Sequence, residues 1–346
     1  MSVEMIVKML VKDKHITMKT TKIFTILTLM VFAVGCNKPD DPNNGGGSNN
    51  NGNGDDVVQE GAILGKYTIN EKGDQVFFSQ GNLQYQASSN TWRFAENQWS
   101  FVGGWFMGAG KEYGNVYENE VKCDNELIAP DYSGWIDLFG WGTSGWNSGA
   151  VCYQPYSVSS NDSDYFLGDS YENDMIDAYS KADWGVYNTI SNGGSRAELW
   201  RTLSKAEWEY VLMNRRTSSG IRFAKGNVNE VNGLILLPDD WDVSMYFLNN
   251  TNQTESSFGG NVISVSDWES MESNGAVFLP LGGNRFGNYY CDAGNYWTIN
   301  TNGFGEIYGT YLYPVCYLRF DSHNVTVRGD GFRKYGQSVR LVCSTN

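Results

Sequence analysis

Histidine is almost absent from this chain of 346 residues, which contains only His15 and His323. A zinc site built on imidazole needs more than one histidine, and a Ser-His-Asp triad would have to use His323. His15 lies in a segment that we predict below to be missing from the mature protein. The composition therefore excludes histidine-based zinc chemistry, and we expect no metal and no cofactor.

Basic residues are also few, with 25 Lys and Arg against 39 Asp and Glu and a net charge of −14. A negatively charged surface repels the phosphates of nucleic acids and the head groups of anionic lipids. We therefore expect no nucleic-acid partner and no direct attraction to an anionic membrane.

Aromatic and turn-forming residues are abundant instead: 12 Trp, 21 Tyr and 17 Phe stand beside 40 Gly and many Asn. The aromatic side chains can form a large core, which argues against a disordered chain. Gly and Asn favour turns, so short strands and loops are expected rather than long helices.

The amino-terminal region has the pattern of a secretory signal peptide. A basic stretch, Met18–Lys22, precedes the uncharged run Ile23–Gly35 and then Cys36. This run is too short to span a bilayer. Because residues 1–17 precede the basic stretch, they are interpreted as an upstream extension, and residues 1–35 are predicted to be absent from the mature chain. A buried apolar strand that ends in a core cysteine is the alternative.

Ala33–Cys36 resembles the lipobox of bacterial lipoproteins, which implies that Cys36 is lipidated. Lys38–Asp41 resembles the acidic surface-export signal of some Gram-negative lipoproteins. Residues 36–56 are rich in Gly and Asn and are predicted to be a flexible tether. We expect a protein anchored by lipid in the outer membrane and exposed on the cell surface, whose residues 57–346 form a single domain.

Short β-strands are predicted throughout that domain. Val76–Phe78 and Leu83–Tyr85 flank Ser79–Asn82 and read as a β-hairpin. Asn232-Gly233 is a hairpin-type turn signal. Further strands are predicted at Ile221–Ala224, Leu234–Leu237, Ala276–Pro280 and Ser338–Val342.

Two helices are predicted. Lys205–Asn214 follows a capping box formed by Ser204 and Glu207, and Leu203 and Trp208 occupy the positions of a hydrophobic staple. A second helix is predicted at Met175–Ile190, with these positions buried: Ile176, Tyr179, Trp184, Tyr187 and Ile190. Two helices among many short antiparallel strands indicate an α+β fold.

Three segments, in the same order, carry a family resemblance. Trp200–Tyr210, Gly294–Thr298 and Gly336–Val342 resemble motifs of the formylglycine-generating enzyme and sulfatase-modifying factor group. The resemblance implies a C-type lectin-like fold. It is closest to bacterial surface lipoproteins of the major paralogous domain type and to the variable proteins of diversity-generating retroelements, in which error-prone copying rewrites codons near the carboxyl terminus.

The family's enzymatic and calcium-binding residues do not carry over. The copper-dependent oxidase of this fold uses two neighbouring cysteines, whereas Cys316 has Cys291 as its nearest counterpart in sequence. The calcium-binding triplets of sugar-binding lectins are absent; Gln154-Pro155-Tyr156 and Trp146-Asn147-Ser148 are near misses. We therefore expect no catalytic residues and no calcium-dependent sugar binding.

Other chemistry-bearing residues have structural explanations as well as functional ones. Five cysteines remain besides Cys36, and free thiols are favoured although the secretory route permits disulfides. Solvated or structural roles are favoured for carboxylates that a catalytic site could use. Trp135, Trp141 and Trp146 could stack on sugar rings, although core packing is favoured for most of them. The cysteines are Cys123, Cys152, Cys291, Cys316 and Cys343, and the carboxylates are Glu207, Glu209, Asp239 and Asp240.

Residues 284–335 hold consecutive aromatic and polar residues that no alternating strand can bury on one face. Exposed tyrosine gives large contact area with few rotatable bonds, which favours a binding surface. We expect a variable surface that binds a protein or glycan ligand on another cell or a phage. Its candidate residues are Phe286, Tyr289, Tyr290, Asp292, Asn300, Asn302, Phe304, Tyr308, Tyr311, Tyr313, Asp330 and Phe332.

Three alternatives remain open. The first is an ordinary loop-rich core with scattered surface aromatics. The second is a divergent enzyme of the formylglycine-generating or another type. The third is a structural component of the cell surface, such as a fibre tip.

Overall fold

The computed structural model describes residues 59–106, 111–170, 172–286, 289–291, 293–307 and 310–345. Residues Asp55–Asn346 form one compact unit. The predicted signal peptide, the predicted lipidation site Cys36 and the whole predicted tether lie outside the described residues.

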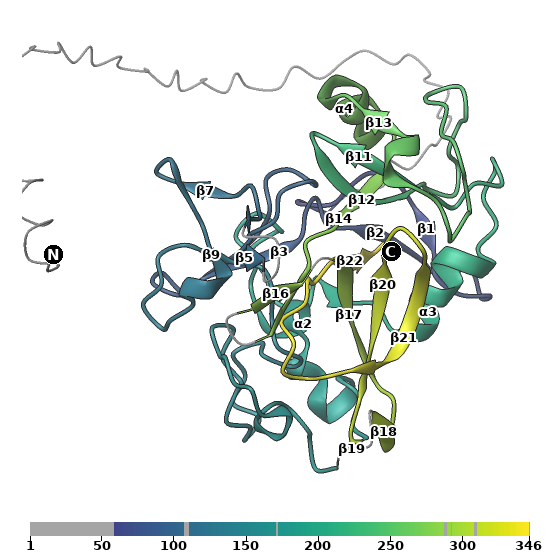
Figure 1. Ribbon diagram of the computed structural model, residues 1–346. Coiled ribbons are helices and arrows are strands. Elements are labelled where there is room, and N and C mark those ends of the chain that lie inside the picture. Colours follow the sequence, from purple (N-terminus) through teal and green to yellow (C-terminus); the bar gives the residue numbers. More distant parts are fainter. Residues whose placement is uncertain are drawn as a thin grey trace, which may run out of the picture. The chain divides into compact units, whose positions relative to one another are not determined.

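Many short strands, mostly antiparallel, form several small sheets (Figure 1), which confirms the α+β prediction. One sheet has the order β1-β2-β22-β10 and joins the two ends of the domain, because β2 pairs with β22. Its strands are β1 (Tyr67–Thr68), β2 (Gln75–Phe78), β22 (Leu341–Ser344) and β10 (Arg201–Thr202).

A second sheet has the order β13-β11-β12-β14 and packs under helix α4. Its strands are β11 (Phe223–Val228), β12 (Val231–Leu236), β13 (Val262–Ile263) and β14 (Val277–Pro280). Helix α4 (Val265–Ser273) buries Trp268 and Met271 against Ile235 and Phe278 of this sheet. The sequence reasoning missed this helix, although Ser264 caps it by accepting a hydrogen bond from the Asp267 amide.

A third sheet, β17-β20-β21, runs through the carboxyl-terminal part of the domain beside helix α3 (Figure 1). Its strands are β17 (Gly294–Thr301), β20 (Val315–Phe320) and β21 (Val325–Gly331). The hairpin β18 (Gly305–Ile307) and β19 (Thr310–Leu312) extends from the end of this sheet.

Smaller strand groups and single-turn helices complete the domain. They are the sheet of β4 (Thr91–Phe94), β3 (Leu83–Gln86) and β9 (Trp135–Ile136); the sheet of β15 (Asn284–Phe286), β16 (Tyr289–Cys291), β5 (Trp105–Phe106) and β6 (Lys111–Glu112); the hairpin of β7 (Tyr117–Glu118) and β8 (Val121–Lys122); and the turns η1 (Asn125–Leu127), η2 (Asp162–Asp164) and η5 (Phe258–Gly260).

The first predicted helix is confirmed. Helix α3 (Lys205–Glu209) continues as a π-helical turn, η4 (Tyr210–Asn214). Ser204 Oγ accepts from the Glu207 amide at 3.2 Å, and Glu207 accepts from the Ser204 amide at 2.7 Å. Trp208 is fully buried, as expected for the staple position.

The second predicted helix is broken into two pieces. Residues η3 (Asp177–Ala182) form a 3-10 segment, and α2 (Trp184–Tyr187) begins anew after Asp183. The Asp183 carboxylate accepts from the Gly185 amide and from the backbone and hydroxyl of Thr202, which holds Asp183 in an extended conformation. The prediction that Ile176 and Tyr187 are buried is wrong, because both are exposed.

The predicted hairpin of Val76–Phe78 with Leu83–Tyr85 is also wrong, although both segments are strands. The Ser79 amide donates to Leu341 O, and the Leu83 amide donates to Val339 O. The end of the first strand and the start of the second therefore bond to the same carboxyl-terminal segment, one after the other, and not to each other. A turn signal between two apolar runs does not show whether the runs pair with each other or with a distant third strand.

The turn predicted at Asn232-Gly233 lies three residues earlier in the chain. Asn229 and Glu230 form it, with φ of 47° and 66°. Gly233 lies inside β12 instead, where a Cβ atom would stand 2.3 Å from the Phe278 ring. This glycine serves close packing between strands rather than a turn.

Candidate ligand-binding surface

The sheet β17-β20-β21 supports the carboxyl-terminal aromatic residues from a rigid core. Tyr296 and Trp297 of β17 are buried against β20, and the Trp297 indole donates to Phe139 O at 2.6 Å. The Phe320 ring occupies the space beside Gly294, where a Cβ atom would meet it at 2.0 Å. Close packing of these rings and backbone pairing therefore hold β17 and β20 in place.

The first aromatic group at the end of this sheet is the pair of Phe304 and Tyr313, which we name the hairpin pair. These residues flank β18 and β19, and their ring centroids are 5.6 Å apart. Phe304 is 58% exposed and Tyr313 is half-buried. The Tyr313 carbonyl accepts from Arg333 Nε at 3.0 Å, which ties the hairpin pair to the following segment.

The second group, which we name the aromatic triad, consists of Phe286, Phe332 and Tyr335. All three are half-buried, and the Tyr335 ring lies 5.5 Å from Phe286 and 5.1 Å from Phe332. Lys334 Nζ lies 5.1 Å from the Phe286 ring and 5.3 Å from the Phe332 ring. Lys334 Nζ also donates to Ser160 O at 3.0 Å, so this cation is fixed over two ring faces.

Arg333 lies between Phe332 and Tyr335 in sequence and ties this segment of the aromatic triad to the hairpin pair. Its guanidinium is buried, lies 4.9 Å from the Trp141 ring, and donates to the carbonyls of Tyr313 and Phe166. Burial lowers the pKa of Arg333 to about 10, against the opposing effect of Asp162. The side chain remains charged at neutral pH, and it positions the two aromatic groups relative to each other.

The predicted polar residues have mostly structural partners. Asn300 donates to Asp174 Oδ2 at 2.6 Å and accepts from the Lys205 amide at 2.7 Å, so its side chain is used within the fold. Asp330 forms an ion pair with Arg328 and accepts from the Tyr317 hydroxyl at 3.3 Å. Burial opposes ionisation of Asp330, but these partners hold its pKa below the ordinary value.

Asn302 is exposed and packs against Gly329, where a Cβ atom would lie 2.5 Å from its side chain. The side chains of five predicted residues lie outside the described part of the chain: Tyr289, Tyr290, Asp292, Tyr308 and Tyr311.

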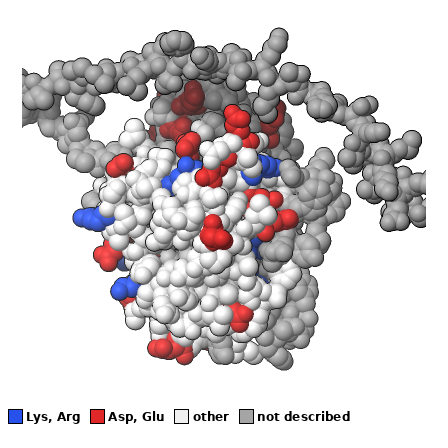
Figure 2. Space-filling view, turned by 90° about the vertical axis from the view of Figure 1, so that its left-hand side faces the viewer, with Lys and Arg blue, Asp and Glu red and all other residues white. Residues whose placement is uncertain are grey.

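The structure therefore brings Phe304 next to Tyr313 and brings both Phe286 and Phe332 next to Tyr335. Sequence reasoning omitted Lys334 and Tyr335 from the candidate site, although the run Phe332-Arg333-Lys334-Tyr335 alternates rings and cations in a way that signals such contacts. Figure 2 looks onto the left-hand side of Figure 1, where β7 and β9 lie, and shows isolated charged side chains among uncharged residues in its lower half.

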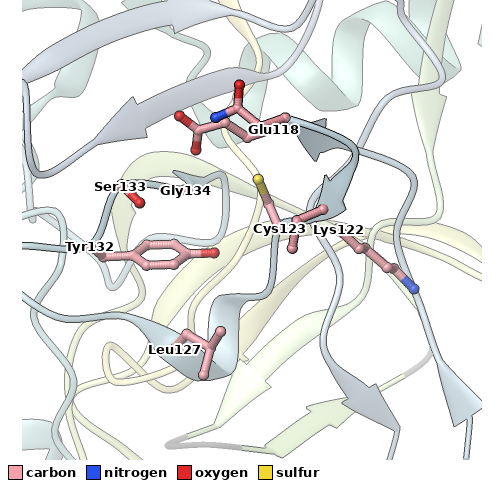
Figure 3. A pocket seen from close by; sticks show the side chains of 9 residues that line it. Glu118, Lys122, Cys123, Leu127, Tyr132, Ser133 and Gly134 are labelled. Atoms are coloured by element: carbon pink, nitrogen blue, oxygen red, sulfur yellow. The ribbon is translucent and has the colours of Figure 1, made fainter. Parts of the chain in front are cut away.

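A separate cavity of about 340 Å³ lies beside the β7–β8 hairpin (Figure 3). The Cys123 sulfur and the Tyr132 hydroxyl face it, whereas Lys122 points away. Burial raises the pKa of the Cys123 thiol, and the Tyr132 hydroxyl accepts from the Asp124 amide at 2.8 Å. These groups provide neither a thiolate nor a free base, so the cavity does not resemble a nucleophilic site.

In the part of the chain that the structure describes, four cysteines are buried free thiols, namely Cys123, Cys152, Cys316 and Cys343. This confirms the free-thiol interpretation for those four. Burial raises the pKa of Cys316 to about 11, and its Sγ donates to Thr301 O at 3.5 Å. In the described residues no group of three His, Cys, Asp or Glu side chains is arranged to hold a metal ion.

Glu207, Asp239 and Trp141 have structural roles. Glu207 caps α3 and pairs with Arg201 at 2.7 Å. Asp239 accepts from Thr68 and Gln75 and forms an ion pair with Arg215 at 2.8 Å. Trp141 is buried in the core. Trp135 and Trp146 are half-buried, and the Arg93 guanidinium lies 3.7 Å from the Trp135 ring.

His323 is exposed in the turn between β20 and β21, and its amide donates to Asp321 Oδ1 at 2.8 Å. Among the described residues no helix is long and apolar enough to cross a membrane.

Comparisons with known proteins found no matching family model, no similar curated protein and no similar solved structure.

Proposed function

We propose that this chain is a cell-surface lipoprotein whose C-type lectin-like domain binds a protein or glycan ligand through its carboxyl-terminal aromatic residues. The observation that carries the proposal is that the hairpin pair lies at the end of sheet β17-β20-β21 and that Arg333 ties it to the segment that carries Phe332 and Tyr335 of the aromatic triad. Phe304 is 58% exposed there, although its neighbour Tyr313 is already half-buried.

Preorganisation makes these rings suitable for binding. The Phe304 and Tyr313 rings already contact each other, and the triad is held by Lys334 and by the backbone pairing of Arg285 with Gly336. Few side-chain rotors need to be immobilised when a ligand covers such a surface, so more of the contact energy appears as affinity.

Contacts among the three resemblance segments support the proposed fold. Arg201 and Thr202 pair with Val342 and Leu341, and the Trp297 amide donates to Ser338 O at 3.0 Å. Segments that lie far apart in sequence therefore adjoin one another in the core.

Diversification by a retroelement is part of the proposal. The buried residues Tyr296 and Trp297 keep the sheet intact, while exposed positions such as Asn302 and Phe304 lie where changes cost little stability. Sequencing of the neighbouring DNA tests this part. We expect a reverse transcriptase gene and a near-copy of the codons for residues 284–335 that differs at adenines; the absence of such a near-copy would contradict diversification without touching the binding claim.

The surroundings of Cys316 argue against the oxidase alternative. A nucleophilic or metal-binding cysteine must become a thiolate, and the Cys316 thiol is fully buried with its pKa raised to about 11. The sheet around it would have to open before a substrate reached the sulfur.

Photo-cross-linking on cells tests the binding proposal. A photoreactive benzoylphenylalanine replaces Phe304 in the full chain displayed on its own cells, and the cells are mixed with candidate partner cells or phage before illumination. The matched control carries the same group at Leu64, which is 60% exposed. Mass spectrometry then identifies the attached molecule.

We expect a dominant adduct from position 304 that excess unlabelled protein suppresses and that position 64 does not give. No adduct at position 304, or the same adducts from both positions, would contradict the assignment of the binding surface.

A further inference from the structure

A second surface of the domain combines negative charge with exposed apolar side chains. Residues 226–284 contain no Lys, Arg or His. They contain eight acidic residues: Glu230, Asp239, Asp240, Asp242, Glu255, Asp267, Glu269 and Glu272. Of these, Asp239 pairs with Arg215, and Glu272 accepts from Gln98 at 2.8 Å.

The same stretch also has large apolar side chains that are exposed to solvent. Phe247 is 79% exposed and Val262 is 71% exposed, and Val243 and Met245 are also exposed. Isolated exposed apolar residues are ordinary, but a group of them rimmed by one sign of charge marks an interaction site.

Hydrogen bonds bring the two most exposed residues onto neighbouring segments. The Asn249 amide donates to Asn261 Oδ1 at 2.7 Å, and Asn261 Nδ2 donates to Asn249 O at 3.0 Å. Leu248 and Ile263 point inward and pack with Trp268 in one core cluster. Their chain neighbours Phe247 and Val262 therefore project outward from adjacent segments.

Acidic residues border this apolar group on two sides. Asp240 and Asp242 begin the 240–248 loop, and both are exposed. Asp267 of α4 lies near Tyr246 of the same loop: burial and then the Asp267 charge raise the pKa of that tyrosine. Figure 2 shows acidic side chains gathered in its upper part, the height at which α4 and β13 lie in Figure 1.

We propose that Val243, Met245, Phe247 and Val262, together with Asp240, Asp242 and Asp267, form a docking patch for a basic amphipathic segment of a partner protein. Apolar residues of that segment cover Phe247 and Val262, and its Lys or Arg side chains face the carboxylates. Charge complementarity selects this partner, because an anionic lipid surface or a second copy of this acidic chain would bring like charges together. The patch is separate from the aromatic surface proposed above.

A labelled synthetic amphipathic helix built from Leu and Lys serves as the probe, and a helix with Glu in place of Lys serves as its charge control. Both are titrated with the full chain in fluorescence anisotropy at several salt concentrations. We expect the Lys helix to bind and the Glu helix not to bind.

Matched variants locate that binding. Phe247→Ser combined with Val262→Ser should weaken binding of the Lys helix by about tenfold or more, whereas Leu127→Ser, which changes a side chain that is 63% exposed elsewhere, should not. Asp240→Asn with Asp242→Asn should weaken binding and reduce its salt dependence, whereas Glu60→Gln with Glu71→Gln removes equal charge and should not. Circular dichroism checks that each variant is folded.

The proposal is overturned if the Lys helix does not bind, if the Glu helix binds equally well, or if the patch variants bind as tightly as the controls. It is also overturned if Phe247→Ser instead abolishes sedimentation with neutral phosphatidylcholine vesicles or abolishes self-association of the chain, because the occupant would then be a lipid surface or a second copy.

Discussion

The stability of the domain should depend on pH through the buried carboxyl group of Asp137. This side chain is fully buried and accepts from the Val102 amide at 2.6 Å and from Asn125 Nδ2 at 3.3 Å. Burial raises its pKa from 3.8 to about 7, because these hydrogen bonds compensate only part of the lost hydration.

The sign and size of the effect follow from proton binding. Between about pH 4 and pH 7 the folded chain retains a proton on Asp137 that the unfolded chain releases. The free energy of unfolding therefore falls as the pH rises through this window, and the contribution is complete only below the unfolded pKa. At about 1.4 kcal/mol per pH unit, the loss is on the order of 4 kcal/mol.

Asp137→Asn should remove this pH dependence, because an amide does not ionise in the window. Its oxygen can still accept from Val102, and its amide group can donate to Asn125 Oδ1, a buried atom without a hydrogen-bond partner. Urea unfolding followed by tryptophan fluorescence at pH 4.5 to 8 measures the free energy of unfolding of both proteins. The effects of other buried acids cancel in the difference between wild type and variant. Equal pH slopes for wild type and variant would refute the reasoning.

Three further predictions concern stability and the buried thiols. Trp208→Ala should lower the free energy of unfolding by about 3–5 kcal/mol, since the indole is fully buried in a large core cluster; a stable variant in urea would show that the core tolerates its loss. Asp239→Asn should cost about 3–5 kcal/mol because it leaves the buried Arg215 guanidinium without its ion-pair partner, whereas Asp240→Asn should have little effect; equal unfolding midpoints for the two variants would count against the ion pair. Cys316 and Cys343 should resist alkylation by iodoacetamide until the chain unfolds, because burial raises their pKa to about 11 and about 12; rapid labelling of either thiol in native protein, mapped by mass spectrometry, would exclude that burial.

Local sequence patterns predicted the elements whose stabilising contacts are local. The capping box of Ser204 and Glu207 lies within one turn of helix, so the sequence alone located the start of α3. The burial of Trp184 and Trp208 was predicted from their places on the predicted helices and from the large apolar area of the indole ring.

Patterns failed where distant residues determine the local conformation. Asp183 interrupts the second predicted helix because Thr202, nineteen residues along the chain, supplies two hydrogen bonds to its carboxylate. Gly233 lies in a strand because Phe278 fills the space beside it. No local rule contains either contact, and the same holds for the pairing of β2 with β22.

The candidate surface was predicted in outline rather than in detail. The consecutive aromatic and polar residues after residue 284 predicted that some aromatic side chains there are exposed, and Phe304 is exposed. Sequence could not show that Asn300 is used by Asp174 and Lys205, or that Lys334 lies over two of the rings, because both arrangements depend on loops from earlier in the chain.

The most direct test of the central claim is the affinity of the molecule recovered by cross-linking at position 304. Isothermal titration compares wild type with the double variant Phe304→Ala, Tyr313→Ala and with the control Leu64→Ala, after urea unfolding has shown equal stability. The proposed binding surface predicts a loss of about a hundredfold or more in the double variant and none in the control. Equal affinity of the double variant and wild type would contradict it.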